Sequence, residues 1–272
     1  MPRTRVLSTR VHHANELILL TKWMDMDIYT EEIHHKESRI KIITDQKALI
    51  KEALKELITL RNIIENHIRK DPYFQIALEP FSYNEDVHEL ITCMMDGAQV
   101  ASVGPMAAVA GTIAEYICRR LMEKKAAIAV VENGGDIFAY TEVPIVVGLF
   151  SGSENLGNRL AFELGKENTP LAICSSSSLL GHSLSFGRCS LVTVFSKKGC
   201  IADAVATAAC NRIHDETDIQ KTLEWACALQ GVDGIIIHKN DKIGMIGTIP
   251  KLVTGENSTI TEKITKDQRY IL

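Results

Sequence analysis

The chain has 272 residues, of which 46% are hydrophobic and 24% are charged, and its formal net charge is −4 at pH 7. This composition is typical of a globular protein with a buried core, in one large domain or two small ones. The small negative charge gives no general attraction to nucleic acid or anionic membranes, and no apolar run reaches membrane-spanning length. Because the basic start also lacks the apolar core of a signal peptide, we expect a cytoplasmic protein.

The first half of the sequence predicts strands and helices in pairs. Charged and branched residues alternate at 39–44, and apolar residues then recur at helical spacing until Pro72. The predicted elements are a strand at 39–44 with a partner at 16–20, a helix from 46 to Pro72, a helical stretch over 87–124 interrupted at Gly104 and Pro105, and strands at 127–131, 137–140 and 144–150.

The second half repeats this order of elements. Strands are predicted at 171–175 and 191–195, helices at 202–213 and 216–230, and a hairpin at 234–238 and 242–249. We therefore predict an α+β fold of two duplicated antiparallel sheet-and-helix units. The units would cover about 1–150 and 171–250, joined by a Gly-, Ser- and Asn-rich connector at 151–170 into a single body over 1–272.

The cysteines give no ligand pattern. No two of the seven stand in C-x-x-C spacing, which excludes the common zinc and iron–sulfur arrangements. Their number is odd and most lie among apolar residues, so we expect buried free thiols in a reducing compartment. A sulfur carrier among them is the alternative. The seven are Cys93, Cys118, Cys174, Cys189, Cys200, Cys210 and Cys227.

Asp203 and Thr207 are the most informative pair in the chain. They stand four residues apart near the start of an alanine-rich predicted helix, so their oxygens project from one helical face. Such a pair can hold Mg²⁺ while free backbone N–H groups at the helix start receive phosphate. The alternative, a commoner arrangement, is that Asp203 only caps the helix and Thr207 bonds back to the preceding turn.

A polar turn formed by Asn133, Gly134, Gly135 and Asp136 follows a predicted strand. The two glycines allow a sharp turn and a close approach to a ligand, while Asn133 and Asp136 offer polar groups. The alternative is an ordinary hairpin turn, which needs only positive φ angles.

Small residues, alanine and glycine above all, predominate at positions 104–112, at a predicted helix start. Without bulky side chains, the backbone around Ala108 and Gly111 can contact either the flat ring of a ligand or a second helix. This segment alone favours helix packing.

A hydroxyl-rich loop follows another predicted strand, with Ser175, Ser176, Ser177 and Ser178 leading toward His182. The hydroxyls and loop N–H groups can bind phosphate oxygens, and His182 can act as a general base near neutral pH. A flexible linker is the alternative, although linkers seldom contain histidine. No Walker loop, G-x-G-x-x-G after a strand or G-x-S-x-G elbow is present.

Together these segments resemble the ApbE superfamily, the FAD:protein FMN transferases, and more closely its uncharacterised ApbE-like branch. The matching stretches, 103–111, 132–137, 181–187 and 202–207, occur in the order found in that branch. The resemblance implies a tandem T-fold type of structure, in which an antiparallel sheet-and-helix unit is duplicated. This agrees with the order of elements predicted above.

The resemblance also implies a metal site. In the transferases an acid and a threonine four residues later bind Mg²⁺, and these positions match Asp203 and Thr207. A backbone carbonyl near the small-residue segment, at 108–110 here, completes the site. The implied cofactors are Mg²⁺ and FAD or FMN, so the partner would be a small phosphate-containing ligand.

A flavin pocket and a reactive histidine are implied as well. The Gly-Gly-acid turn that lines the flavin pocket in the transferases matches Gly134, Gly135 and Asp136. The histidine before the metal helix matches His182, and the acceptor of FMN would be a protein.

The sequence departs from the transferases at two places. Their histidine is followed by Asp-Pro and then Thr-Gly, whereas residues 183–187 read Ser-Leu-Ser-Phe-Gly. Their small-residue segment has a lysine before the glycine, whereas Ala110 precedes Gly111 here. Metal and phosphate binding can persist under these changes while flavin transfer is lost, because a shared fold does not establish a shared reaction.

Three functions therefore stay open from the sequence. The first is a Mg²⁺-dependent flavin or nucleotide enzyme, and the second is a binding protein that keeps the pocket without turnover. The third is a sulfur-handling protein in which Cys174 or Cys189 carries a nucleophilic sulfur.

Overall fold

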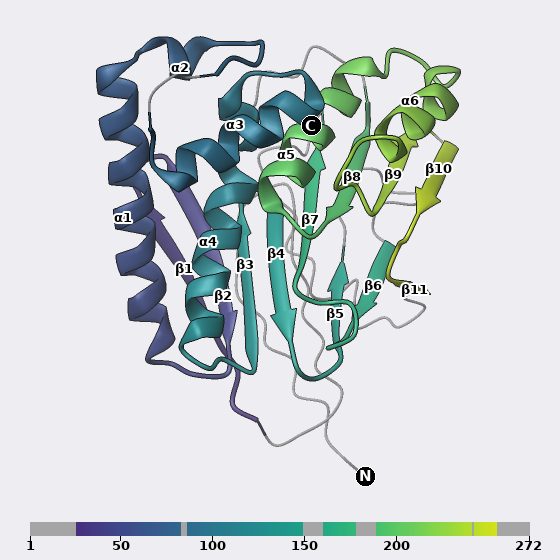
Figure 1. Ribbon diagram of the computed structural model, residues 1–272. Coiled ribbons are helices and arrows are strands. Elements are labelled where there is room, and N and C mark those ends of the chain that lie inside the picture. Colours follow the sequence, from purple (N-terminus) through teal and green to yellow (C-terminus); the bar gives the residue numbers. More distant parts are fainter. Residues whose placement is uncertain (1–25, 83–85, 149–159, 178–188, 241, 255–272) are drawn as a thin grey trace, which may run out of the picture.

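An eight-stranded antiparallel sheet is the centre of the computed structural model, which describes residues 26–82, 86–148, 160–177, 189–240 and 242–254 (Figure 1). The strands lie in the order β1-β2-β3-β4-β7-β8-β9-β10. Their bounds are β1 (Tyr29–His35), β2 (Ser38–Thr44), β3 (Ile128–Asn133), β4 (Asp136–Thr141), β7 (Leu171–Ser176), β8 (Leu191–Ser196), β9 (Gly234–Lys239) and β10 (Lys242–Gly247).

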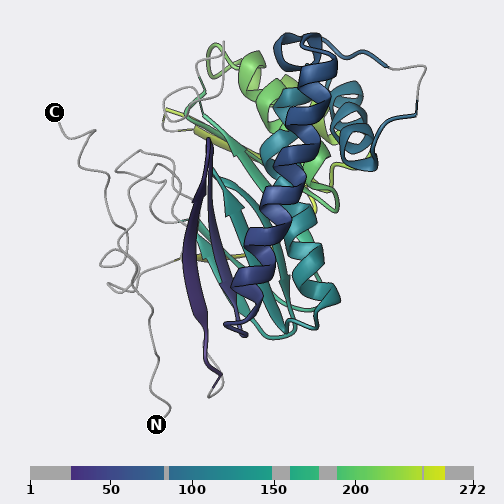
Figure 2. The ribbon, with the colours of Figure 1, turned by 90° about the vertical axis from the view of Figure 1, so that its left-hand side faces the viewer.

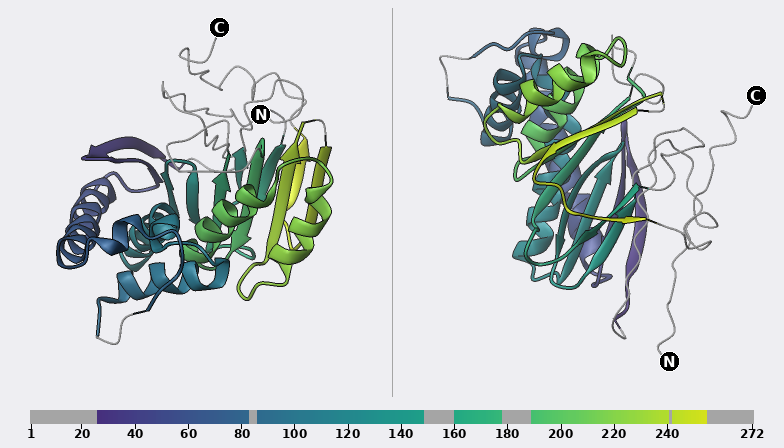
Figure 3. Two further views of the ribbon diagram at one scale, coloured as in Figure 1. Left: turned by 90° about the horizontal axis from the view of Figure 1, so that it is seen from above. Right: turned by 90° about the vertical axis from the view of Figure 1, so that its right-hand side faces the viewer.

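The helices cover one face of this sheet, as the view from above shows (Figure 3). They are α1 (Leu49–Lys70), α2 (Tyr73–Ile76), α3 (Glu89–Ala101), the 3₁₀ turn η1 (Pro105–Ala108), α4 (Val109–Glu123), α5 (Gly199–Arg212) and α6 (Asp218–Cys227). α1 runs along the β1–β2 end of the sheet and packs on α4 (Figure 2). No single helix in the described residues is long and apolar enough to span a membrane, although α3 and Pro105–Glu123 meet that test together as a pair bent by 104°.

A second sheet packs against the other face. Its strands β5 (Ile145–Gly148), β6 (Leu160–Leu164) and β11 (Lys251–Thr254) lie in the order β11-β6-β5. Phe162 of β6 meets Phe195 of β8 edge to face, with ring centroids 5.2 Å apart. The central strands are thus buried on both faces, which explains why their sequences are almost continuously apolar.

Most predicted elements are present, and the α+β class with antiparallel sheets is confirmed. One detail of the prediction is wrong, and one strand was not predicted. The partner of β2 on its outer side is β1, whereas the predicted partner at 16–20 lies outside the described residues. The predicted connector at 151–170 contains β6, whose short apolar run was hidden in a Gly- and Ser-rich context.

The order of elements is the same on both sides of the sheet centre. β1 and β2 precede α1–α4 and are followed by β3 and β4, while β7 and β8 precede α5 and α6 and are followed by β9 and β10. The hairpins of each group stay together in the sheet. Descent of the two groups from one duplicated unit remains a prediction.

Two glycines allow α4 and α5 to cross in close contact. A Cβ on Gly199 would lie 2.1 Å from the carbonyl oxygen of Gly111, and a Cβ on Gly111 would lie 2.5 Å from that of Gly199. Each helix also caps the other: the Asp203 Oδ2 accepts a hydrogen bond from the Gly111 N–H (2.8 Å), and the Glu115 Oε2 accepts one from the Gly199 N–H (2.5 Å). The crossing fixes where Asp203 lies.

We expect Gly199→Ala to lower the free energy of unfolding by roughly 1–3 kcal/mol, because the added methyl group would overlap the backbone of α4 and force the helices apart. Urea denaturation measures this change. The matched control is Gly134→Asn, since Gly134 has nothing within 4 Å of an added Cβ and asparagine tolerates its positive φ of 64°. Equal stability of both variants would contradict the proposed clash.

The structure corrects the expectation that all the cysteines are free thiols. Cys189 and Cys210 form a disulfide across 21 residues, which joins the segment before β8 to the end of α5. The two sulfurs meet only because α5 packs on β8, so their spacing in the sequence carried no signal. The free cysteines are Cys93, Cys118, Cys174, Cys200 and Cys227.

Candidate functional site

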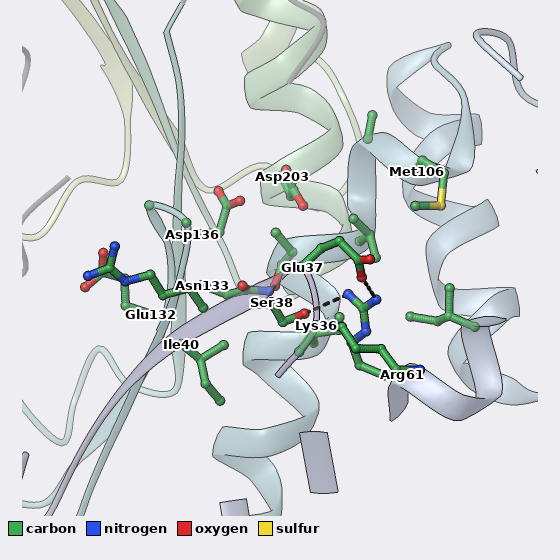
Figure 4. Close-up of a pocket in the computed structure, with 18 of the residues that line it drawn as sticks. Lys36, Glu37, Ser38, Ile40, Arg61, Met106, Glu132, Asn133, Asp136 and Asp203 are labelled. Carbon is green, nitrogen blue, oxygen red and sulfur yellow. Dashed lines mark hydrogen bonds and ion pairs between the residues drawn. The ribbon is translucent and has the colours of Figure 1, made fainter. Parts of the chain in front are cut away.

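A pocket of about 980 Å³ opens between the helices and one end of the central strands (Figure 4). Its walls come from the β1–β2 hairpin, α1, the η1–α4 junction, the β3–β4 turn, the end of β7 and α5. Most predicted site residues within the described part of the chain line it: Asn133, Gly134, Gly135, Asp136, Ser175, Ser176, Ser177, Asp203 and Thr207. Segments that are far apart in the sequence therefore share one cavity, as predicted.

The β3–β4 turn contributes the first polar wall. Gly134 and Gly135 adopt positive φ angles of 64° and 104°, which glycine permits at no steric cost. Asn133 and Asp136 are cross-strand partners on either side of this turn, and both lie in the pocket wall. The Asn133 Nδ2 donates to the Ala110 carbonyl (3.2 Å), which ties the turn to the start of α4. The same four residues therefore form an ordinary hairpin turn and a wall of the pocket.

Asp203 lies in the second turn of α5, since that helix begins at Gly199 with Lys198 as N-cap. It therefore caps α4 and not its own helix, contrary to the capping alternative. The Asp203 side chain is buried, and burial raises its pKa to about 7 against the opposing effect of hydrogen bonds from the Gly111 and Ala110 N–H groups. Thr207 follows one turn later in the same wall.

Asp136 faces the same space from the turn (Figure 4). Its carboxyl is buried and accepts a hydrogen bond from the Ser175 N–H (3.1 Å). Burial first, and then the charge of Asp203, raise the pKa of Asp136 well above its usual value. Two carboxyl groups thus share a low-dielectric site in which the charge of Asp203 opposes ionisation of Asp136.

Neither carboxyl has a basic partner in the described part of the chain. The ion pairs there all involve other acids, and no lysine, arginine or histidine is among the groups that set the pKa of Asp136 or Asp203. The described residues also contain no group of three or more His, Cys, Asp or Glu side chains able to hold a metal ion. A buried acid pair without a counter-charge is stable only when it binds protons or a cation.

Successive serines at the end of β7 point to opposite faces of the sheet, so their hydroxyls meet different partners. The Ser175 hydroxyl contacts the Thr193 Oγ1 (2.9 Å), and the Ser177 hydroxyl donates to the Ser190 carbonyl (2.6 Å). The Ser176 hydroxyl is buried and has no hydrogen-bond partner in the described residues. Of the predicted phosphate-binding hydroxyls in the described residues, only that of Ser176 therefore lacks a hydrogen-bond partner, while Ser178 and His182 lie outside the described residues.

Ala108 and Gly111 are not among the residues that line the pocket, so their assignment as ligand-binding residues stays a prediction. The Ala108 carbonyl accepts a hydrogen bond from the Thr112 hydroxyl (2.5 Å), and Gly111 is covered by Gly199. Helix packing explains both residues, because the small side chains serve the crossing of α4 and α5. Their neighbours Ala107 and Ala110 form the wall instead.

The cysteines near the pocket are not exposed nucleophiles. Cys174 is buried, and burial together with the charges of Asp136 and Asp203 raises its pKa well above the usual value. Cys189 is held in the disulfide. Both sulfurs named in the sulfur-handling hypothesis therefore lack the thiolate that such chemistry needs.

Sequence reasoning missed the wall that α1 and the β1–β2 hairpin supply. Arg61 of α1 donates to the Ser38 hydroxyl (3.0 Å) and pairs with Glu37 (Figure 4). It also pairs with Glu65 (3.2 Å). A signal existed, since Arg61 interrupts the apolar stripe that includes Leu60 and Ile64. A basic residue at such a position often has a buried partner.

Comparisons with known proteins agree with this architecture. A family model described as "AbpE bacteria" matches residues 22–232. A UPF0280 protein of Methanococcus vannielii is 37% identical over 235 residues, covering 85% of this chain and 95% of the relative. A UPF0280 protein of Archaeoglobus fulgidus is 35% identical over 230 residues, covering 83% and 95%.

Solved structures share the fold at low sequence identity. The ApbE protein of Thermotoga maritima superposes with a TM-score of 0.57 at 11% identity, covering 87% of this chain and 99% of the other. A variant of the flavin transferase ApbE of Vibrio cholerae gives 0.54 at 12% identity, covering 88% and 100%. From the extent of the family match and the identity to its relatives, the chain belongs to the ApbE-related family described as AbpE bacteria, together with the UPF0280 proteins.

Proposed function

We propose that the pocket binds the diphosphate of a flavin or nucleotide together with Mg²⁺, and that Asp203, Asp136 and Thr207 hold the cation. One observation carries this proposal: two buried carboxyl groups with raised pKa values share the pocket without a basic partner in the described residues. A divalent cation would let both ionise, and a diphosphate would complete its coordination.

The chemistry of the available donors fits Mg²⁺. This ion prefers oxygen ligands and is usually held by one or two carboxylates plus substrate phosphates and water. The pocket offers two carboxylates and the Thr207 hydroxyl. Because no three His, Cys, Asp or Glu side chains in the described residues form a group that could hold a metal ion, we favour a site that a phosphate ligand completes over a protein-only cage.

The corresponding acid of the first half supports this interpretation. Glu115 follows Gly111 by four residues, as Asp203 follows Gly199, and each acid caps the other helix. Glu115 is neutralised by Arg119, four residues later, whose Nε lies 2.7 Å from its Oε1. At the matching position α5 has the neutral Thr207. We propose that the two halves are duplicated units and that a cation replaces Arg119 in the second.

The remaining walls suit the other parts of such a ligand. The Ser176 hydroxyl lies in the pocket wall and has no partner in the described residues, which favours phosphate oxygens as its partner in the proposed complex. Met106 and Ile113 offer apolar contact for a ring. The Asn133–Asp136 turn supplies hydrogen bonds to it.

We further propose that the site transfers FMN to a protein acceptor, with His182 as general base. The support is the shared fold with proteins titled flavin transferase and the motif order around Asp203. The changed residues 183–187 favour the second candidate, binding without turnover.

Incubation with FAD, with and without Mg²⁺, tests both candidates. Transfer predicts Mg²⁺-dependent release of AMP, detected by chromatography, and labelling of an added acceptor peptide with FMN. Binding without turnover predicts retained FAD and no AMP. If FAD and ADP both fail to bind in Mg²⁺, the proposed function is wrong.

A further inference from the structure

Two free thiols outside the pocket are in contact where α3 crosses α5. The Sγ of Cys93 on α3 lies 2.9 Å from the Sγ of Cys200 on α5, although the residues are 107 positions apart. Cys93 is half-buried and Cys200 is buried. Neither sulfur takes part in the pocket or in the Cys189–Cys210 disulfide.

The backbone geometry brings these sulfurs together. Gly97 lies one turn after Cys93, on the same face of α3, and a Cβ there would lie 2.3 Å from the Cys200 carbonyl oxygen. The absence of a side chain at Gly97 thus sets the short separation of the helices at Cys200. Because a disulfide bond is about 2.05 Å long, the sulfurs must approach by roughly 0.9 Å to form one.

We propose that Cys93 and Cys200 are an oxidation site, at which a hydroperoxide converts the two thiols into a reversible disulfide between α3 and α5. Cys200 lies one turn before Asp203, so the bond would fasten the start of the helix that bears the pocket acid. This inference does not depend on the identity of the pocket ligand.

The reaction balances with hydrogen peroxide as oxidant. Cys93 is the more exposed thiol and reacts first: its sulfur attacks a peroxide oxygen, the O–O bond breaks, a sulfenic acid forms and water leaves. The Cys200 sulfur then attacks the sulfenic sulfur, the S–O bond breaks and a second water leaves. The two thiols lose two electrons and two protons, and the peroxide is reduced to two waters.

The environment of Cys200 supports this order. Its hydrogen bond with Cys93 and its burial raise the pKa of Cys200 above the usual value, so it stays protonated while both thiols are reduced. Oxidation of Cys93 removes that hydrogen bond and presents an electrophilic sulfur in contact with Cys200.

Thiol alkylation of the full chain tests the proposal. The protein is treated with a small excess of hydrogen peroxide, unfolded in iodoacetamide, weighed intact, and digested without reductant. We expect the five free thiols to fall by two, with a peptide pair linked through Cys93 and Cys200 that dithiothreitol separates. The Cys227→Ser variant should lose two thiols in the same way, whereas Cys93→Ser should lose none to a disulfide.

Three results would overturn the proposal. The first is a full set of alkylated thiols after peroxide, and the second is Cys93 as sulfinic acid beside an alkylated Cys200. The third is either cysteine linked to a different partner. Because peptide mapping of the unmutated protein decides among these outcomes, the test does not depend on the folding of any variant.

Discussion

The Asp203→Asn variant should bind Mg²⁺ roughly 100-fold more weakly than the parent protein in the presence of ADP, while its fold is retained. The amide oxygen of asparagine can still accept the Gly111 N–H bond that Asp203 accepts at 2.8 Å, so the cap on α4 survives. The substitution removes the negative charge of Asp203, which we propose binds the cation. Titration calorimetry of Mg²⁺ into protein and ADP measures the change.

Glu115→Gln is the matched control for that experiment. Glu115 also is a buried carboxylate that caps a helix of the same crossing, but it is paired with Arg119 and does not line the pocket. Its replacement should lower stability and leave Mg²⁺ affinity within about twofold of the parent. If both variants lose Mg²⁺ affinity equally, the loss comes from disturbing the crossing of α4 and α5, and Asp203 is not a metal ligand.

Protein without metal should become less stable as pH rises from 5 to 8. The pKa of Asp203 is about 7 in the folded protein and near 3.8 in the unfolded chain, so the folded state binds this proton more tightly. The resulting stability is fully present below about pH 4 and is lost as pH rises to about 7. From pH 5 to 8 the expected loss is on the order of 3 kcal/mol.

Urea denaturation across this pH range measures that loss, and Asp203→Asn should remove the part of the pH dependence that Asp203 contributes, while the part from the buried Asp136 persists. Mg²⁺ with ADP should stabilise the parent more at pH 8 than at pH 5, since the cation needs the ionised acid. Parallel pH profiles for parent and variant would show that Asp203 ionises freely. That result would exclude a raised pKa for Asp203 in the folded protein.

The sequence predicted the elements well because their signals are local. The apolar spacing of α1 and the alternation in β2 follow directly from the period of each element. The strand β6 escaped because five residues in a Gly- and Ser-rich context carry too little periodicity. The Cys189–Cys210 bond escaped because contact between α5 and β8 creates it.

The candidate site was predicted in outline and missed in its details. Spacing placed Asp203 and Thr207 on one helical face, and glycines marked the turn beside Asp136. The pleat of β7, however, decides that Ser175 and Ser177 bond elsewhere while Ser176 stays unpaired in the described residues. Such differences between neighbours depend on register, which sequence alone does not specify.

The sequence could not predict which helix the Asp203 carboxyl caps. An acid near a helix start ordinarily caps that helix, and the sequence favoured this interpretation. The structure turns the carboxyl to α4 instead, because Gly111 and Gly199 let the two helices cross at short distance. Asp203 can therefore cap α4 and line the pocket at the same time, which only the contact between α4 and α5 reveals.

Anomalous scattering from a crystal grown with Mn²⁺ and ADP would show whether Asp136 and Asp203 share a cation, since Mn²⁺ occupies oxygen sites suited to Mg²⁺. We expect a single strong peak in the pocket, within about 2.2 Å of a carboxylate oxygen of both Asp136 and Asp203 and beside the diphosphate. A diphosphate bound elsewhere, or a pocket with nucleotide and no metal peak between these two acids, would contradict it.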